Sequence, residues 1–202
     1  MKLYFSPGAC SLSPHIALLE AGLPCHTEQV DLGTKMTASG IDYRTINPKG
    51  YVPALELDDG SLLTEAAVVV QYIADQAPDK QLAAPAGTLA RYRQMAWLNF
   101  IATELHKNFG PLFNPAASGE LKNTARANLA KRLPEVARVL ESQEFLAGER
   151  FSVADCYLFT VLSWSGHVQV ALDAWPQLGA YLARIAARPA VQQALRDEGL
   201  LG

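Results

Sequence analysis

A cysteine at a predicted strand-to-helix turn is the residue of this sequence best placed to do chemistry. Cys10 lies between a strand-like run at residues 2–5 and an apolar segment at residues 16–22. The N–H groups and dipole of a helix N-terminus stabilise an anion, and the thiolate is the reactive form of cysteine. The position therefore predicts a thiol predisposed to ionise. The alternative is a small packed apolar residue, since free cysteines are often buried.

Local signals around Cys10 predict the turn itself. Pro7-Gly8 should end the preceding strand, and Ser11 or Ser13 can cap the following helix. Pro14 falls in the first helical turn, where a missing N–H costs nothing. The cysteine is therefore expected at the point where a strand gives way to a helix.

The first 77 residues predict an α/β domain. The first helix should stop at Gly22 and a strand should follow at about 27–31, which makes a βαβ unit with a right-handed crossover. Residues 35–43 predict a short or irregular helix. Alternating residues around Asp58-Asp59-Gly60 predict a β-hairpin, and residues 64–76 predict a helix capped by its first residues. The order βαβ, α, ββα is the thioredoxin-like arrangement.

The remainder of the chain predicts an all-α domain. Residues 78–87 contain two prolines and no periodicity, which is typical of a linker. No strand pattern follows, so residues 88–202 are expected to form a helical domain. Helical patterns occupy residues 88–113, 121–142, 152–166, 175–187 and 189–198.

A capping box is predicted at the start of one of these helices. Ser152 can reach forward and Asp155, three residues on, can reach back before an apolar run. We expect Asp155 to stabilise the helix and not to take part in catalysis.

The helix at 88–113 has a polar flank beside its apolar face. Stepping 100° per residue brings Asn99, Thr103 and His106 together next to a face made by Leu98, Ala102, Leu105 and Phe109. A histidine there can share a proton or a hydrogen bond with a sulfur atom.

A second side of the same helix is also apolar. Trp97, Phe100 and Ile101 point away from the first face. We expect a second copy of the chain to cover this side, which predicts a homodimer. The alternative is cover by the helices at 121–142 and 152–166.

Composition excludes several classes of protein. The chain has 202 residues, 50% of them hydrophobic, and a net charge of -3, so neither nucleic acid nor an anionic membrane is expected as a partner. Its three cysteines have no metal-ligand spacing, and no metal is expected. No signal pattern or membrane-spanning run is found, which predicts a protein of the reducing cytoplasm.

Several motifs in their order resemble one family. They are residues 6–11 (SPGACS), 47–53 (NPKGYVP), 63–66 (LTEA), 97–99 (WLN) with 103–107 (TELHK), and 151–155 (FSVAD). Together they cover the whole chain and resemble the bacterial Beta class of the cytosolic glutathione S-transferases. A cysteine at the first turn, in place of tyrosine or serine, is what indicates that class.

The resemblance implies how glutathione, as co-substrate, would be bound. Pro53 would follow a cis peptide bond and leave the backbone of Val52 free to pair with the cysteinyl unit. Glu65 would accept the γ-glutamyl ammonium, while helix N–H groups take its carboxylate. Family members often have serine where this chain has Ala66, so a hydroxyl contact is lost. Lys35 is implied to meet the glycyl carboxylate.

The resemblance also implies a site shared between domains, with the second-substrate site and a dimer surface on residues 88–202. Cys10 and His106 would be the catalytic pair, and Lys107 a second cation for glutathione. Asn99, Thr103 and Glu104 are implied to contribute, across the dimer interface in some cases. The other histidines, His15, His26 and His167, are expected to be surface or packing residues.

Two enzymatic outcomes and one non-catalytic outcome remain open. Cys10 could form a mixed disulfide with glutathione, which gives thiol–disulfide exchange and peroxide reduction. Alternatively, glutathione is conjugated to a hydrophobic electrophile and Cys10 only positions its sulfur. In either case the second-substrate pocket would be lined partly by Phe5, Phe109, Phe113 and Trp164, although such an aromatic cluster is more often part of a core. The third possibility is a carrier or adaptor with the same fold.

Overall fold

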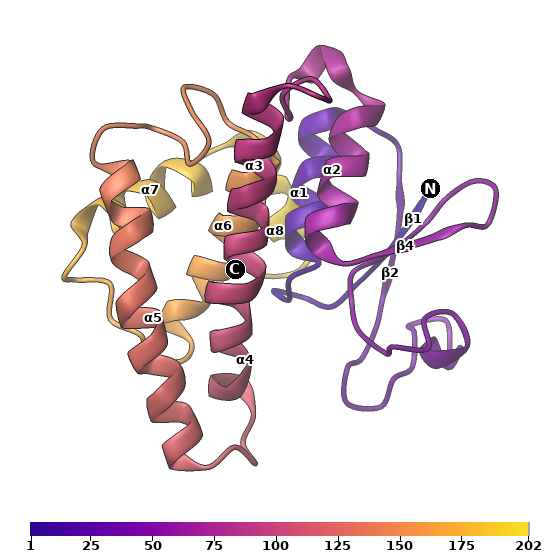
Figure 1. Cartoon of the computed structure of the whole chain (residues 1–202). Helices are drawn as coiled ribbons and strands as arrows, with labels where there is room; N and C mark the ends of the chain where they lie inside the picture. Colours follow the sequence, from indigo (N-terminus) through magenta and orange to yellow (C-terminus); the bar gives the residue numbers. More distant parts are fainter. Residues whose placement is uncertain (202) are drawn as a thin grey trace. The chain divides into compact units, whose positions relative to one another are not determined.

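A four-stranded mixed sheet organises the N-terminal part of the chain (Figure 1). The computed structural model describes residues 1–201. These divide into two compact units. The first is Met1–Ala83 together with the segment from Arg188, and the second is Ala84–Ala187.

The sheet has the topology that the sequence predicts. Its strands are β1 (Lys2–Phe5), β2 (His26–Gln29), β3 (Ala54–Glu56) and β4 (Leu62–Thr64), in the order β2-β1-β3-β4. β1 is parallel to β2 and antiparallel to β3, and β3 and β4 form the predicted hairpin. The thioredoxin-like fold of the first unit is thereby confirmed.

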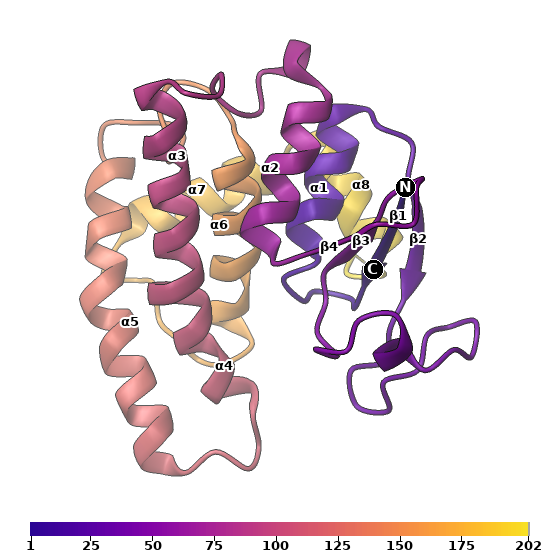
Figure 2. The same ribbon diagram turned by 45° about the vertical axis from the view of Figure 1, so that its right-hand side comes forward.

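Three helices complete the first unit. They are α1 (Leu12–Ala21), α2 (Ala66–Gln76) and α8 (Pro189–Asp197). Figures 1 and 2 show α1 beside α2, and α8 beside α1. The N–H of Gly22, at φ 67°, bonds to carbonyls of the last turn of α1, which ends the helix as predicted. Because α1 has a helix on either side, it is buried more widely than one apolar stripe would require.

The predicted helix at residues 35–43 is wrong. The carboxylate of Asp31 accepts hydrogen bonds from the N–H groups of Gly33 and Thr34, and Lys35 has a φ of 63°. Such a turn with a left-handed residue is incompatible with continuous helix. The chain forms isolated β-bridges there and then only the 3-10 turn η1 (Tyr43–Thr45).

The second unit is helical, as predicted. Its α-helices are α3 (Leu89–Phe100), α4 (Lys107–Phe113), α5 (Gly119–Leu140), α6 (Val153–Ser163) and α7 (Pro176–Ala186). Short 3-10 turns are η2 (Pro78–Lys80) in the first unit and η4 (Trp164–Gly166) after α6. In Figures 1 and 2, α4 runs alongside α5, and α3 packs against α6.

A π-helical segment, η3 (Ile101–His106), interrupts the helix expected at 88–113. A π turn holds more residues than an α turn, so it changes which side chains face inward. Ile101, predicted to point toward a second surface, is fully buried. Trp97 and Phe100 are half-buried and their rings pack edge to face at 5.4 Å. The second apolar side is therefore narrower than predicted.

The segment from Arg188 belongs to the first unit, although its sequence predicts a place in a domain of residues 88–202 after a linker at 78–87. Arg188 bonds to Glu20 of α1 through Nε and Nη2, at 2.7 and 2.9 Å. Val191 and Ala194 of α8 are buried. The helix at 189–198 was predicted correctly, but no local signal showed that it packs on α1.

The predicted capping box at the start of α6 is present. Asp155 Oδ2 accepts hydrogen bonds from the N–H and the hydroxyl of Ser152, at 2.9 and 3.0 Å. Its Oδ1 accepts from Leu146 N–H and the Tyr181 hydroxyl, at 2.8 and 3.0 Å. Asp155 therefore ties the start of α6 to α7 and to the loop before it.

Replacing Asp155 with alanine should destabilise the protein strongly. Asp155→Ala leaves several buried donors without an acceptor, and we expect a loss of about 2–4 kcal/mol in the free energy of unfolding. Urea denaturation measures it. Ser118→Ala is the matched control, because the Ser118 hydroxyl caps α5 with one bond to Leu121 N–H, and it should cost about 1 kcal/mol. Equal losses for both variants would contradict this role for Asp155.

Candidate functional site

Cys10 lies in a turn that its neighbouring serines close. Ser11 occupies the N-cap position of α1, but its hydroxyl makes no cap bond. It accepts a hydrogen bond from Ser6 N–H at 3.1 Å and donates one to the Ser6 carbonyl at 3.2 Å. The Ser13 hydroxyl donates to the Cys10 carbonyl at 2.7 Å. The predicted capping role is therefore wrong for both serines, which fix the turn and not the helix end.

The Cys10 thiol is a hydrogen-bond donor. Its Sγ lies 3.1 Å from the Val52 carbonyl oxygen. Desolvation raises the pKa of Cys10 to about 12, although the N–H groups of Cys10 and Ser11 act in the opposite direction. The prediction that the Cys10 thiol ionises readily is therefore wrong for the protein without glutathione. Helix N–H groups do favour the thiolate, but burial outweighs them.

The segment that accepts the hydrogen bond of the Cys10 thiol also has a backbone donor, the Val52 N–H. The Val52–Pro53 peptide bond is cis, as the resemblance implied. The Tyr51 carbonyl accepts hydrogen bonds from the Tyr43 hydroxyl at 2.9 Å and Asn47 Nδ2 at 2.7 Å. Within residues 1–201 we find no acceptor for the Val52 N–H. An extended peptide could pair with that group.

Two lysines approach the same segment. Lys35 Nζ donates to the Gly50 carbonyl at 3.0 Å and lies 5.8 Å from the centre of the Tyr51 ring. Lys49 Nζ lies 2.8 Å from Glu65 Oε1. Sequence reasoning named Lys35 and Glu65 but gave no role to Lys49, although that residue stands inside the 47–53 motif.

Glu65 has an unusual backbone conformation at the start of α2. Its φ is 70° and its ψ is 114°, in a region that costs a non-glycine residue about 1–3 kcal/mol. Its side chain makes no cap bond, so the predicted capping by Thr64 or Glu65 is wrong. In the part of the chain that the structure describes, the N–H groups of Ala66 and Ala67 have no acceptor. These first-turn donors can bind an anion.

His106 belongs to an aromatic cluster of the second unit. Its Nδ1 lies 2.7 Å from the Tyr157 hydroxyl oxygen, and its ring lies 4.8 Å from that of Trp164. The rings of Phe109 and Phe113 each pack edge to face against Trp164 at 5.8 Å. The structure thus brings together most of the predicted aromatic pocket residues. Tyr157 was missed, because nothing in the sequence links it to His106.

The polar flank predicted beside His106 is divided between different partners. The Thr103 hydroxyl donates to the Asn99 carbonyl at 3.0 Å. Glu104 Oε2 accepts from Arg132 Nε of α5 at 2.7 Å. Lys107 and Asn99 are exposed. The structure therefore pairs Asn99 with Thr103, but His106 turns toward Tyr157 instead.

Phe5 and His15 lie together in the first unit, and His15 is a packing residue, as expected. Phe5 contributes to the first unit, where its ring lies 6.0 Å from that of His15. His15 is buried, and its Nδ1 lies 2.9 Å from Glu198 Oε1. His26 and His167 are exposed, as expected. Glu198 was missed, since a carboxylate near the end of a polar helix resembles an ordinary surface charge.

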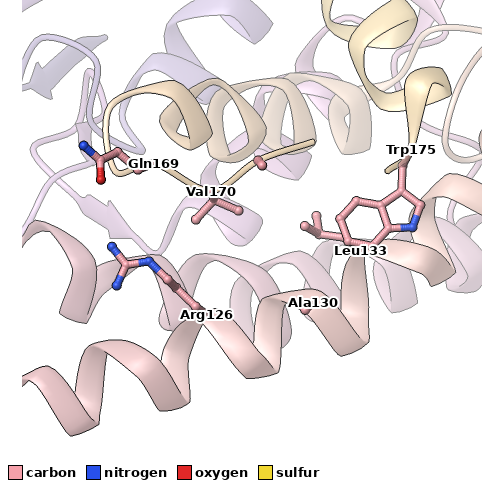
Figure 3. Close-up of a pocket in the computed structure, with 7 residues that line it drawn as sticks. Arg126, Ala130, Leu133, Gln169, Val170 and Trp175 are labelled. Atoms are coloured by element: carbon pink, nitrogen blue, oxygen red, sulfur yellow. The ribbon is translucent and has the colours of Figure 1, made fainter. Parts of the chain in front are cut away.

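A cavity of about 150 Å³ lies within the second unit and contains none of the predicted site residues (Figure 3). Arg126, Ala130 and Leu133 of α5 line one side, and the segment around Val170 and Trp175 lines the other. Residues 1–201 contain no group of three or more side chains suited to hold a metal ion. No helix in that range is both long and apolar enough to cross a membrane.

Comparison with known proteins assigns the family. Models described as the N-terminal and C-terminal domains of glutathione S-transferase match residues 8–76 and 100–189. Glutathione S-transferase GstA of Escherichia coli O157:H7 is 50% identical over 200 residues, which is 99% of this chain and 100% of that protein.

Solved structures agree with this assignment. A bacterial beta class glutathione S-transferase of Sphingomonas chungbukensis is 50% identical, with a TM-score of 0.96 and full coverage of both chains. A sphingomonad glutathione S-transferase complexed with glutathione is 48% identical, with a TM-score of 0.95, over 99% of this chain and 100% of that one. These matches span both units at about half of all positions identical, and this chain therefore belongs to the glutathione S-transferase family, in its Beta class.

Proposed function

We propose that this glutathione transferase binds glutathione along residues 49–53 and conjugates its sulfur to hydrophobic electrophiles. The observation that carries the proposal is the pairing of a protonated Cys10 thiol with the Val52 carbonyl, beside a Val52 N–H that has no acceptor within residues 1–201. A tripeptide backbone supplies both the acceptor for that N–H and a sulfur for that thiol. These groups fit glutathione.

The charged ends of glutathione match the charged groups around this segment. The N–H groups of Ala66 and Ala67 at the start of α2 suit the γ-glutamyl carboxylate, and Glu65 suits the neighbouring ammonium. Lys35 suits the glycyl carboxylate. Lys49, already paired with Glu65, keeps that side chain near the start of α2. Ala66 supplies only its backbone donor.

The protonated state of the Cys10 thiol favours conjugation over thiol transfer. In conjugation the glutathione sulfur forms a bond to an electrophilic carbon, a halide departs with the bonding electrons, and the thiol proton passes to solvent. Cys10 has a single S–H proton, which bonds to the Val52 carbonyl in the protein without glutathione. When glutathione is bound, a neutral Cys10 can turn this proton toward the sulfur anion and so stabilise it. Thiol–disulfide exchange would instead require the Cys10 thiolate, which a pKa of about 12 disfavours.

The second unit is proposed to supply the electrophile site and further polar groups. His106, held by Tyr157 and Trp164, is placed among rings that suit an apolar substrate. We propose that it acts together with Cys10, and that Asn99, Thr103, Glu104 and Lys107 assist glutathione binding, as the resemblance implies.

A homodimer in the cytoplasm is proposed as the working form. On α3, Tyr92 and Met95 are exposed next to the half-buried Trp97 and Phe100, which favours cover by a second copy. Three free cysteines, Cys10, Cys25 and Cys156, favour a reducing compartment.

Removing the charge of Glu65 should weaken glutathione binding. Glu65→Gln loses the ionic partner of the γ-glutamyl ammonium, so the Kd measured by calorimetry should rise about tenfold, equivalent to about 1.4 kcal/mol. Asp58→Asn is the matched control, because Asp58 is an exposed carboxylate paired with the N-terminal amine, and it should leave the Kd unchanged. A Kd within twofold of wild type for Glu65→Gln would exclude this role.

Loss of the Cys10 thiol should slow conjugation without abolishing it. Cys10→Ala removes one neutral hydrogen bond, so turnover of an aromatic halide should fall about fivefold. Cys25→Ala should have no effect. Abolished turnover, together with one glutathione found by mass spectrometry in disulfide linkage to wild-type Cys10, would favour thiol transfer. Glutathione-agarose capture without any turnover would favour the carrier.

The reactivity of Cys10 should follow its raised pKa. In a Cys25→Ser background without glutathione, the rate of alkylation by iodoacetamide should rise about tenfold per pH unit from pH 7 to pH 10, because the thiolate fraction is still increasing. Mass spectrometry of the Cys10 peptide gives the rate. A plateau below about pH 9 would show that the thiol ionises readily after all.

A further inference from the structure

A buried carboxylate of the C-terminal segment contacts the turn that carries Cys10. The side chain of Glu198 has no exposed surface. Its Oε2 accepts a hydrogen bond from Gly8 N–H at 2.9 Å, and its Oε1 lies 2.9 Å from His15 Nδ1. Burying a carboxylate is unfavourable unless its oxygens are bonded. Both oxygens of Glu198 are bonded to the region between Gly8 and His15.

Leu200 of the C-terminal segment also lies beside Gly8. Gly8 has a φ of 69°, and the two terminal methyl carbons of Leu200 lie 3.5 and 3.8 Å from the place where a Cβ of Gly8 would stand. The turn is also closed within itself, since Ala9 N–H donates to the Ser6 carbonyl at 3.0 Å. The C-terminal segment therefore packs on a small, closed loop at the residue two positions before Cys10.

We propose that Glu198 is a positioning residue for Cys10. By fixing the N–H of Gly8, it holds the turn so that the Cys10 thiol meets the Val52 carbonyl. His15 orients the carboxylate of Glu198 through its own bond. The thiol is thus positioned directly by its hydrogen bond to Val52 and indirectly by Glu198, which fixes the turn at Gly8.

This role is separable from the docking of α8 on α1. Docking has its own contacts at the other end of α8, where Arg188 bonds to both carboxylate oxygens of Glu20. Val191 and Ala194 add buried apolar contacts. If Glu198 only helped α8 to dock, its loss should resemble the loss of Glu20.

Three variants separate hydrogen bonding from docking. Glu198→Ala removes the acceptor for Gly8 N–H, whereas Glu198→Gln keeps an oxygen that can accept that bond. Glu20→Ala removes the ion pair at the far end of α8 and leaves the turn untouched. Each variant is made in the Cys25→Ser background, and the alkylation of Cys10 by iodoacetamide is followed at pH 8.5, beside the urea midpoint.

We expect Glu198→Ala to alkylate at least about fivefold faster than the parent, because the released turn exposes the thiol. Glu198→Gln and Glu20→Ala should stay within about twofold, even if Glu20→Ala lowers the urea midpoint as much as Glu198→Ala does. A rate within twofold for Glu198→Ala would overturn the proposal. An equal acceleration by Glu20→Ala would also overturn it, since docking alone would then explain the effect.

Hydrogen exchange in the wild-type protein tests the same contact without a variant. The Gly8 amide lies in a loop, yet its bond to Glu198 should slow its exchange at least about 100-fold relative to an unstructured peptide. Exchange at the unprotected rate would overturn the proposal even if Glu198→Ala failed to fold. The alkylation and exchange experiments use no glutathione, so they remain valid if the proposed conjugation activity is not found.

Discussion

The hydrogen bond from the Cys10 thiol to the Val52 carbonyl is the contact on which the site in the first unit depends. It joins the turn after β1 to the segment before β3, two parts of the chain that are 42 residues apart. Forming it places the sulfur in a desolvated position, and this position raises the pKa of the thiol. The position of Cys10 beside the Val52 carbonyl therefore keeps its thiol protonated. In the protein without glutathione, this thiol is a hydrogen-bond donor.

Around this contact, the backbone of residues 49–53 is fixed by buried polar groups and surrounded by paired charges. Tyr43 and Asn47 hold the Tyr51 carbonyl, so the adjoining Val52 is presented in one orientation. Lys35 bonds to Gly50, and Lys49 pairs with Glu65. A preorganised backbone with charges on both flanks suits an extended peptide with charged ends, because little conformational entropy is lost on binding.

The sequence predicted what depends on local pattern and on recognisable motifs. The order of strands and helices, the Asp155 capping box and the cis bond before Pro53 were all predicted correctly. The failures have physical causes that spacing does not reveal. A positive φ at Lys35 replaced a helix by a turn, and the π segment at 101–106 turned Ile101 inward. Desolvation of Cys10 and burial of Glu198 depend on residues distant in sequence, so neither could be predicted from neighbours.

The return of the segment from Arg188 to the first unit has a consequence for biosynthesis. Translation releases residues in order, so Glu20 and His15 leave the ribosome long before Arg188 and Glu198. Until then α1 lacks one of the helices that cover it, and the first unit cannot reach its final packing. The second unit, whose residues all lie between 84 and 187, is complete earlier. The part of the protein made first is thus the part that matures last.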